Sequence, residues 1–208
     1  MWRPSLLLVD DHTLVLEAFK KLLEPEFNIV GTVTNGEDLL QLTADLKPDV
    51  VLLDLGMPQL NGMEAGRALK KLLPLTKLIV VTMNEDSDLA RESLKLWASG
   101  FLLKKSAGRE LVKAVRDALQ GRTYVTPSIA RQLEDDFIRD PEFEHKRLTD
   151  RQREVLRLLA EGRTMKQTAS ELHVTPRTIA FHKYKIMEEF GLKTNSDLVK
   201  LALRERIV

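Results

Sequence analysis

The sequence contains no cysteine, which excludes disulfide bonds, cysteine-based zinc sites and thiol nucleophiles. Long hydrophobic runs are also missing, since no apolar stretch approaches the roughly 20 residues that a membrane-spanning helix needs. The N-terminal residues lack the basic segment, apolar segment and cleavage site of a signal peptide. We therefore expect a cytoplasmic protein.

Charge is nearly balanced over the 208 residues, with a net charge of +1, but it is unevenly distributed. Residues 147–208 contain 13 Lys and Arg against 8 Asp and Glu, whereas residues 123–146 contain 3 against 6. A basic C-terminal segment is typical of contact with nucleic acid, although a merely solvated surface explains this charge equally well. The length accommodates either one large domain or two small ones.

Apolar runs alternate with amphipathic stretches over the first 122 residues. The alternation predicts a parallel sheet with helices on both faces, which is an α/β domain. Short runs rich in Val and Leu suit strands that are buried on both sides. The expected strands cover residues 5–9, 29–33, 50–53, 77–81 and 101–103, and the expected helices cover residues 13–23, 36–45, 62–72, 87–98 and 107–120.

The pattern changes after residue 122. A helix start at Thr126-Pro127-Ser128, followed by apolar residues spaced four apart, predicts a helix at about 127–138. The acidic, Pro-containing tract from Asp135 to Glu144 has the composition of a linker. Every later segment has a helical pattern. We therefore expect domains at 1–122 and 147–208, joined by residues 123–146.

Three aspartates follow two of the expected strands. Asp10 and Asp11 come directly after the first strand, and Asp54 comes directly after the third. The carboxyl ends of parallel strands meet at one edge of a sheet, where ligands collect. Three carboxylates there repel one another unless a divalent cation is present, and Mg²⁺ prefers such hard oxygen ligands. The candidate Mg²⁺ ligands are Asp10, Asp11, Asp54 and the backbone carbonyl of Gly56.

Asp54 is the candidate nucleophile, because a carboxylate held beside a metal ion can accept a phosphoryl group. Thr82 follows the fourth expected strand and Lys104 follows the fifth, so both can pair with phosphoryl oxygens as these gain charge. Taken singly, Asp11 is equally explained as a helix cap, Asp54 as a turn residue and Lys104 as surface. The joint placement of five matched residues at the ends of four strands favours function.

Residues 1–122 carry the motifs Val9-Asp10-Asp11-His12, Asp54-Leu55-Gly56-Met57-Pro58, Thr82 and Gly100-Phe101-Leu102-Leu103-Lys104. With these motifs the segment resembles the receiver domain of bacterial two-component response regulators. The resemblance implies a doubly wound five-stranded sheet of flavodoxin-like order 2-1-3-4-5 and Mg²⁺-dependent phosphorylation of Asp54. It also implies that Thr82 and Phe101 rearrange as a switch while Lys104 contacts the phosphate. Trp97, Ser99 and Lys105 depart from the family pattern, and Lys105 is the alternative phosphate contact.

Residues 147–208 have the pattern of a helix-turn-helix domain. Thr149 or Asp150 can cap a first helix that Gly162 ends, and residues 165–172 suit a second helix. With Thr175 as N-cap and Pro176 at the first helical position, a third helix is expected over residues 176–190. A short helix, a tight turn and a capped longer helix are typical of DNA-binding proteins.

The third helix carries Arg177, Phe181 and Tyr184 on the side opposite its apolar face, which suits phosphates and base edges. A partner-binding helix is the alternative. The motifs Leu148-Thr149, Arg153-Glu154-Val155-Leu156, Ala160-Glu161-Gly162, Thr178-Ile179, His182 and Gly191-Leu192 resemble the LuxR-type DNA-binding domain, although Ala180 and Thr168 replace its usual Lys and Ile. His182 is expected to pack or to face phosphate. We expect DNA contacts from Thr175, Arg177, Thr178, Ala180, Phe181, Lys183, Tyr184 and Lys185.

These features predict a transcription regulator of the NarL/LuxR type, switched by a partner histidine kinase that phosphorylates Asp54. It would bind double-stranded DNA as a homodimer and would not be an enzyme, apart from slow self-dephosphorylation. A haloacid-dehalogenase-like phosphatase needs an acid two positions after its nucleophile, where this chain has Gly56. A nucleotide-binding oxidoreductase needs a Gly-rich turn where this chain has Asp10-Asp11-His12-Thr13. A receiver that is never phosphorylated remains the third alternative.

Overall fold

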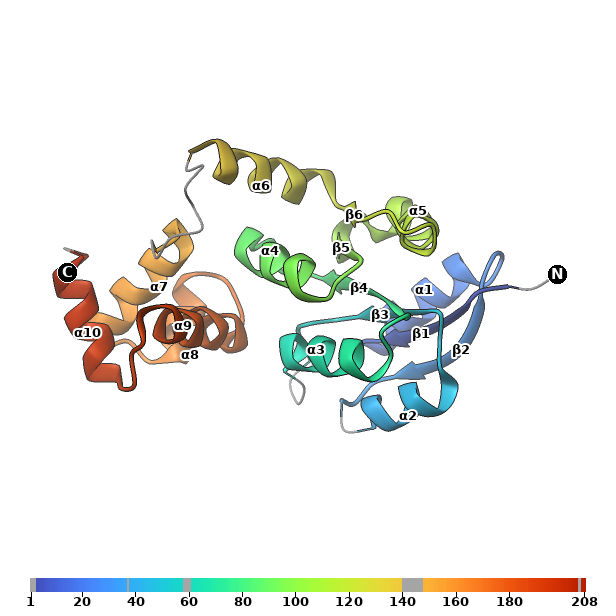
Figure 1. Cartoon of the computed structure of the whole chain (residues 1–208), viewed down its shortest axis with the longest axis horizontal. Helices are drawn as coiled ribbons and strands as arrows, with labels where there is room; N and C mark the ends of the chain where they lie inside the picture. The colour runs from blue at the N-terminus through green and yellow to red at the C-terminus, as the bar shows by residue number, and fades with distance from the viewer. Residues whose placement is uncertain (1–2, 37, 58–60, 140–147, 206) are drawn as a thin grey trace. The chain divides into compact units, whose positions relative to one another are not determined.

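The computed structural model describes residues 3–36, 38–57, 61–139, 148–205 and 207–208. The chain forms two compact units, Met1–Asp135 and Asp136–Val208. The first unit combines a sheet with helices, whereas the described residues of the second unit form helices and no strand (Figure 1). This confirms the predicted fold class, an α/β domain followed by an all-α domain.

A parallel sheet forms the centre of the first unit, and its described strands have the order β2-β1-β3-β4-β5-β6. The first five strands therefore have the predicted order 2-1-3-4-5. The inner strands β3 and β5 are completely buried, as their apolar runs predict, whereas the edge strand β2 is only partly buried. The strands are β1 (Ser5–Val9), β2 (Asn28–Val33), β3 (Val50–Leu53), β4 (Lys77–Thr82), β5 (Gly100–Leu103) and β6 (Tyr124–Val125).

Helices cover both faces of this sheet (Figure 1). Leu16 and Phe19 of α1 and Leu111 and Val115 of α5 belong to one buried cluster with side chains of five strands, which places both helices on one face. The other helices pack in sequence, α2 on α3 and α3 on α4. The five helices are α1 (Thr13–Leu23), α2 (Leu39–Leu46), α3 (Gly62–Leu72), α4 (Ser87–Leu96) and α5 (Ala107–Leu119).

Two of these helices have an end that differs from the predicted one by two residues or more. The helix α2 begins at Leu39 rather than at residue 36, and α4 ends at Leu96 rather than at residue 98. At the end of α4, Trp97 leaves the helical conformation with φ −158° and buries its indole ring. The ring lies against α3, because a Cβ added to Gly66 would stand 2.3 Å from it. Glycine at this position is therefore required by the close approach of Trp97.

The sheet extends beyond the five expected strands. The sequence predicts that residues 123–126 belong to the linker, whereas the structure pairs Tyr124 with Gly100 and Val125 with Phe101 as strand β6. Thr126 then accepts a hydrogen bond from the Leu103 amide at 3.0 Å and donates one to Glu110 Oε2 at 3.1 Å. These bonds tie the start of α6 (Pro127–Arg139) to the end of β5. The acidic tract continues into residues 140–147, which lie outside the described residues.

The second unit consists of α7 (Asp150–Ala160), α8 (Met165–Glu171), α9 (Pro176–Phe190) and α10 (Asn195–Arg204) within its described residues. Threonine side chains cap all four helices, at positions 149, 164, 175 and 194. Pro176 occupies the first turn of α9, as predicted, and Gly191 ends that helix with φ +66°. Leu156, Ile186 and Leu201 form the centre of the core. The predicted helix-turn-helix order, α8 followed by the capped α9, is confirmed.

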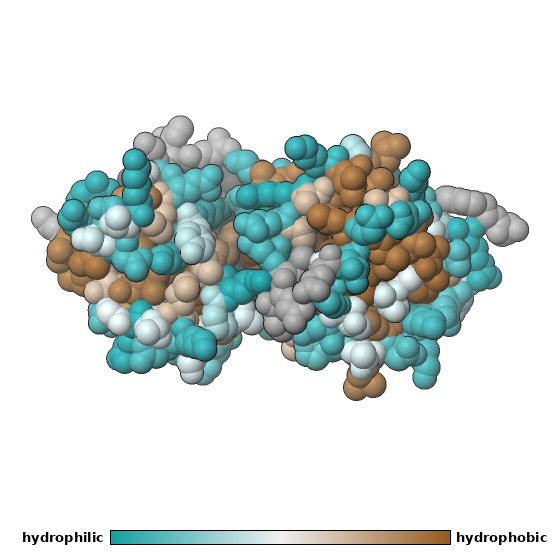
Figure 2. Space-filling model, turned by 90° about the horizontal axis from the view of Figure 1, so that it is seen from below, coloured by the Kyte–Doolittle hydropathy of each residue, from teal (hydrophilic) through white to brown (hydrophobic). Residues whose placement is uncertain are grey.

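The hydropathy of the surface does not single out one face of either unit. Exposed large apolar side chains occur in both units, for example Leu75 in the first and Tyr184 in the second. In the view of Figure 2, apolar and polar residues are interleaved over the visible surface. All described helices are too short or too polar to cross a lipid bilayer.

Candidate functional site

Three carboxylates meet at the carboxyl edge of the sheet, as the sequence predicts. Asp10 follows β1 and Asp54 follows β3, and these strands are paired neighbours whose last residues, Val9 and Leu53, are in register. Asp10 is 2% exposed and Asp54 is 4% exposed. Ligand atoms of Asp10, Asp11, His12 and Asp54 all lie within 4.8 Å of one another. The structure thus brings the predicted acids together and adds a histidine to them.

Lys104 supplies a positive charge to this cluster. Its Nζ atom lies 2.7 Å from Asp10 Oδ2 and 2.7 Å from Asp54 Oδ2, and its side chain is almost fully buried. Lys105 instead pairs with Glu85 at 2.6 Å, and both of those side chains are about half exposed. Of the two adjacent lysines, Lys104 is therefore the one that contacts the carboxylates.

Burial and hydrogen bonding have opposite effects on the pKa values of Asp54 and Lys104. Burial raises the pKa of Asp54, although hydrogen bonds from Lys104 and from the Gly56 amide act against the rise. Burial lowers the pKa of Lys104, but its hydrogen bonds to Asp10 and Asp54 outweigh burial and leave that pKa raised. The ammonium group is thus held in its charged form, while the carboxylate of Asp54 remains incompletely compensated.

Gly56 leaves space beside the carboxylate of Asp54. Its amide donates a hydrogen bond to Asp54 Oδ1 at 2.9 Å, and a Cβ at this position would lie 3.3 Å from both carboxylate oxygens. A larger residue would therefore crowd the group that the sequence identifies as the nucleophile. Pro58, part of the same predicted motif, lies outside the described residues.

Thr82 and Phe101 occupy the strands next to the carboxylates. Thr82 ends β4, is buried, and accepts a hydrogen bond from the Asn84 amide at 3.1 Å through its hydroxyl group. Phe101 lies fully buried in β5, paired with Val80 of β4. The structure therefore places both predicted switch residues on neighbouring strands, with Thr82 at the carboxylate edge.

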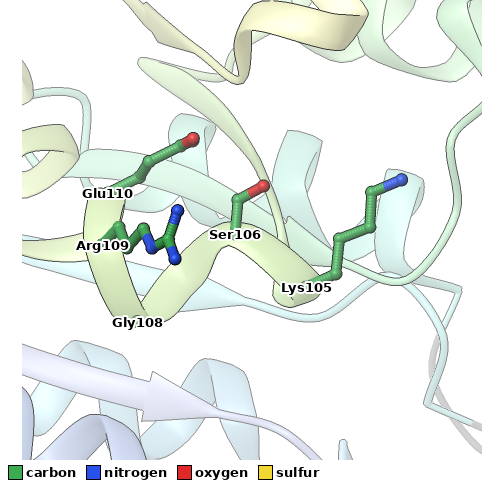
Figure 3. A pocket seen from close by; sticks show the side chains of 5 residues that line it. All are labelled: Lys105, Ser106, Gly108, Arg109 and Glu110. Atoms are coloured by element: carbon green, nitrogen blue, oxygen red, sulfur yellow. The ribbon is translucent and has the colours of Figure 1, made fainter.

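A depression at the start of α5 is lined by Lys105, Ser106, Gly108, Arg109 and Glu110. It was not predicted from the sequence. Figure 3 shows Lys105 extending away from Arg109, so the two cations do not converge on a common point. Lys105 already pairs with Glu85. The depression therefore gives no separate binding site.

The predicted DNA-contacting residues lie along α9 and at its cap. Tyr184 is 61% exposed, and the Thr175 N-cap is also exposed. The ammonium groups of Lys183 and Lys185 lie 5.6 Å and 5.7 Å from the ring centres of Tyr184 and Phe181, respectively. Cations and aromatic rings therefore alternate along one helix. The remaining predicted contacts Arg177, Ala180, Phe181, Lys183 and Lys185 are partly exposed.

Two polar residues of α9, Thr178 and His182, are buried instead. Thr178 is 5% exposed, its amide donates to Thr175 Oγ1 at 3.2 Å, and the two hydroxyl groups lie 3.0 Å apart. This side chain therefore completes the helix cap inside the unit, and a DNA contact from Thr178 stays a prediction. His182 is fully buried, which agrees with packing rather than with a phosphate-facing position.

Comparisons with known proteins give the family. The model of the response regulator receiver domain matches residues 6–116, and that of the bacterial regulatory proteins of the luxR family matches residues 146–202. The oxygen regulatory protein NreC of Staphylococcus epidermidis is 31% identical over 98% of this chain and 99% of its own length. The response regulator GacA of Pseudomonas aeruginosa is 31% identical over 98% of this chain and 97% of its own.

Solved structures show the same two-part organisation. The response regulator RcsB of Salmonella typhimurium is 29% identical, with a TM-score of 0.63 and coverage of 97% of this chain and 98% of that one. An RcsB–DNA complex is 29% identical, with a TM-score of 0.64 and coverage of 96% and 97%. The chain therefore belongs to the response regulators that combine a receiver domain with a DNA-binding domain of the luxR type.

Proposed function

We propose that this protein is a transcription regulator switched by Mg²⁺-dependent transfer of a phosphoryl group from a partner histidine kinase to Asp54. The observation that carries the proposal is the buried position of Asp54 at the carboxyl edge of the sheet, where the charged Lys104 contacts both Asp54 and Asp10. A structural salt bridge would need one carboxylate for one ammonium group, whereas here two buried carboxylates share one and a third, that of Asp11, lies close to them. The excess negative charge favours a site for a divalent cation.

The donor set fits Mg²⁺. Carboxylate oxygens are hard ligands of the kind that this ion prefers, and one oxygen of Asp11 is buried without a hydrogen-bond partner among the described residues. Asp10, Asp11, Asp54 and the backbone carbonyl of Gly56 would hold the ion. When bound, Mg²⁺ neutralises the anionic oxygens of the donor, which three carboxylates would otherwise repel.

The residues of the chain have defined roles in the transfer. A carboxylate oxygen of Asp54 forms the new P–O bond while the P–N bond of the kinase's phosphohistidine breaks, and the imidazole nitrogen keeps the electron pair and takes up a proton. Lys104 exchanges its contact with Asp54 for one with a phosphoryl oxygen, and the Thr82 hydroxyl donates to another. Movement of Thr82 would allow Phe101 to rearrange, which transmits the signal.

For the second unit we propose that α9 enters the major groove of double-stranded DNA. This is supported by the exposed Tyr184 and by the cations that lie over the rings of Phe181 and Tyr184. One short helix reads few base pairs, so a homodimer on two half-sites about one helical turn apart would supply specificity. In related structures, two RcsB dimers are bound to two parallel DNAs. The proposed contacts are Thr175, Arg177, Thr178, Ala180, Phe181, Lys183, Tyr184 and Lys185.

We assign one function to each predicted domain: phosphorylation to residues 1–122 and DNA binding to residues 147–208. Residues 123–146 connect the two. Because Tyr124 and Val125 pair with β5, and Thr126 bonds to Leu103, the connection begins within the sheet next to Lys104. A change at the phosphorylation site would therefore reach α6 through β5.

The proposal is tested by incubating the full chain with acetyl phosphate and Mg²⁺ and measuring its mass. One phosphoryl group should be added to the wild type and none to Asp54→Asn. Asp49→Asn is the matched control, because Asp49 precedes the same strand at its other end and binds Ser5. Labelling of Asp54→Asn, or labelling that a chelator leaves unchanged, would contradict the assignment.

A further inference from the structure

His12 lies at the carboxylate cluster, and its ring faces the acids. The Nδ1 atom is 2.8 Å from Asp11 Oδ1 and 3.2 Å from Asp10 Oδ1. Together with Asp54, these residues offer four potential ligand atoms within 4.8 Å of one another. The His12 side chain is 65% exposed. Packing in the core therefore does not determine where the ring lies.

Helix capping does not explain the position of the ring either. His12 is the N-cap of α1, yet its side chain makes no capping hydrogen bond. Its backbone amide donates to Asp10 Oδ1 at 3.0 Å, and its ring Nδ1 lies within hydrogen-bond distance of the same oxygen at 3.2 Å. The amide bond holds the backbone beside the acids, and the imidazole nitrogen is directed at their oxygens.

The oxygens of Asp10 are divided between two neighbours. Oδ2 contacts Lys104, whereas Oδ1 faces His12. On Asp11, Oδ1 is buried and has no hydrogen-bond partner in the described part of the chain, although Nδ1 of His12 is 2.8 Å away. A nitrogen and two oxygens thus lie close together, and a cation bound among them would be shared by all three.

The spacing of these atoms matches that of ligands around one ion. Adjacent ligands of an octahedral ion, each about 2.1 Å from it, are about 3.0 Å apart. The two separations from Nδ1, 2.8 Å and 3.2 Å, lie on either side of this value. No rearrangement of the backbone is needed for a nitrogen to join the site.

We propose that His12 is a ligand of this metal site through Nδ1, and that it gives the site a preference for first-row transition ions such as Co²⁺ over Mg²⁺. The inference rests on the proposed metal site at Asp10, Asp11 and Asp54. Imidazole nitrogen binds transition ions well, whereas Mg²⁺ favours oxygen ligands. The affinity of the receiver for metal would then depend on which divalent ion is available.

Calorimetric titration of the full chain with Mg²⁺ and with Co²⁺ tests the inference. His12→Asn, which replaces the nitrogen ligand by an amide, should lower Co²⁺ affinity by about tenfold or more and leave Mg²⁺ affinity within about twofold. His173→Asn is the matched control at an exposed histidine with φ +53°, a conformation that asparagine tolerates, and it should bind both ions as the wild type does. Bound Co²⁺ should also produce a shifted, exchangeable imidazole N–H proton signal that His12→Asn lacks.

Three results would overturn the inference. If His12→Asn loses affinity for both ions equally, or loses no affinity for Co²⁺, then His12 does not bind the transition ion as a ligand. A gain in affinity for both ions in His12→Asn would show that the imidazole only pairs with the acids as a competing cation. Failure of all three proteins to bind Mg²⁺ would instead contradict the proposed metal site itself, which separates the two conclusions.

Discussion

The two units of this chain build their sites in opposite ways. In the receiver, Asp10, Asp54 and Lys104 are buried, and paired strands determine where they meet. In the helical unit, Tyr184 and the cations of α9 project from one helix whose ends are set by Thr175 and Gly191. The first site is a closed arrangement of charges, and the second is a partly open surface.

Because of this difference, the two sites have different effects on stability when their ligands are absent. Buried charges lose their hydration, so the carboxylate cluster depends on Lys104 and on a bound cation. Charges on α9 remain in contact with water and cost little without DNA. Substitutions in the receiver site should therefore change stability and phosphorylation together, whereas substitutions on α9 should change DNA binding alone.

The largest effect should follow from Lys104→Met. This change removes the ammonium group that contacts both Asp10 and Asp54 and leaves both carboxylates buried. Without metal, the receiver should lose about 3–5 kcal/mol of stability, the usual result of removing one partner from a buried ion pair. Urea unfolding followed by tryptophan fluorescence measures this unit, since both tryptophans lie within it.

Lys105→Met is the matched control for this variant. Its partner Glu85 is about half exposed, so the loss should be below about 1 kcal/mol. Mg²⁺ should restore part of the stability of Lys104→Met and change Lys105→Met no more than it changes the wild type. Equal losses in the two variants would mean that burial does not distinguish these lysines.

The second effect concerns packing rather than charge. Gly66→Ala would place a methyl group 2.3 Å from the Trp97 ring, so α3 and α4 must separate. Overpacking of this kind should cost about 1–3 kcal/mol of receiver stability. Gly108→Ala, in the first turn of α5 with nothing within 4 Å, should instead stabilise by about 0.5–1 kcal/mol. If urea unfolding shows that Gly66→Ala lowers stability and Gly108→Ala raises it, the contact with Trp97, and not the loss of a glycine, is responsible.

The parts that could be predicted from the sequence are those that local rules determine. Asp54 and Lys104 were identified because an apolar run followed by a polar residue places that residue at the sheet edge. The cap at Thr175 and the start of α9 follow from residue preferences at helix ends. These features depend on a few neighbouring residues and on the parallel order of the strands.

The parts that were missed depend on contacts between distant segments. The pairing of Tyr124 with Gly100, and the bond between Thr126 and Leu103, join residues more than 20 positions apart. The burial of Thr178 against the cap residue Thr175 is also not predicted by its place in the helix sequence. The adjacency of His12 to two aspartates was the available signal for its place in the cluster.

The third effect tests the open surface of the second unit. Tyr184→Ala should weaken specific DNA binding by about 1–3 kcal/mol and leave binding to unrelated DNA nearly unchanged. Because Tyr184 is 61% exposed, its removal should change the stability of the helical unit by less than about 0.5 kcal/mol. Lys200→Ala on α10, at an exposed site, is the control and should retain sequence preference. A binding-site selection that recovers one motif with the same specificity from all three proteins would rule out base reading by Tyr184.

The smallest effect concerns the charge of Asp54. Burial raises its pKa above the ordinary 3.8, despite the hydrogen bonds from Lys104 and Gly56, so the folded receiver binds this proton more tightly than the unfolded chain does. The group therefore favours the folded state at low pH, and this contribution is lost as pH rises through the raised pKa. At neutral pH and without metal, Asp54→Asn should unfold at a higher temperature than the wild type.

The difference between the two proteins should narrow as pH is lowered toward the raised pKa, because the wild-type carboxyl then becomes neutral as the amide is. Added Mg²⁺ should stabilise the wild type more than Asp54→Asn, since the variant lacks one of the proposed ligands. Thermal unfolding at several pH values, with and without Mg²⁺, measures both trends. If the difference in unfolding temperature between the two proteins widens on acidification, the buried carboxylate of Asp54 does not destabilise the folded receiver. The receiver site would then resemble the open surface of α9 more closely than its burial indicates.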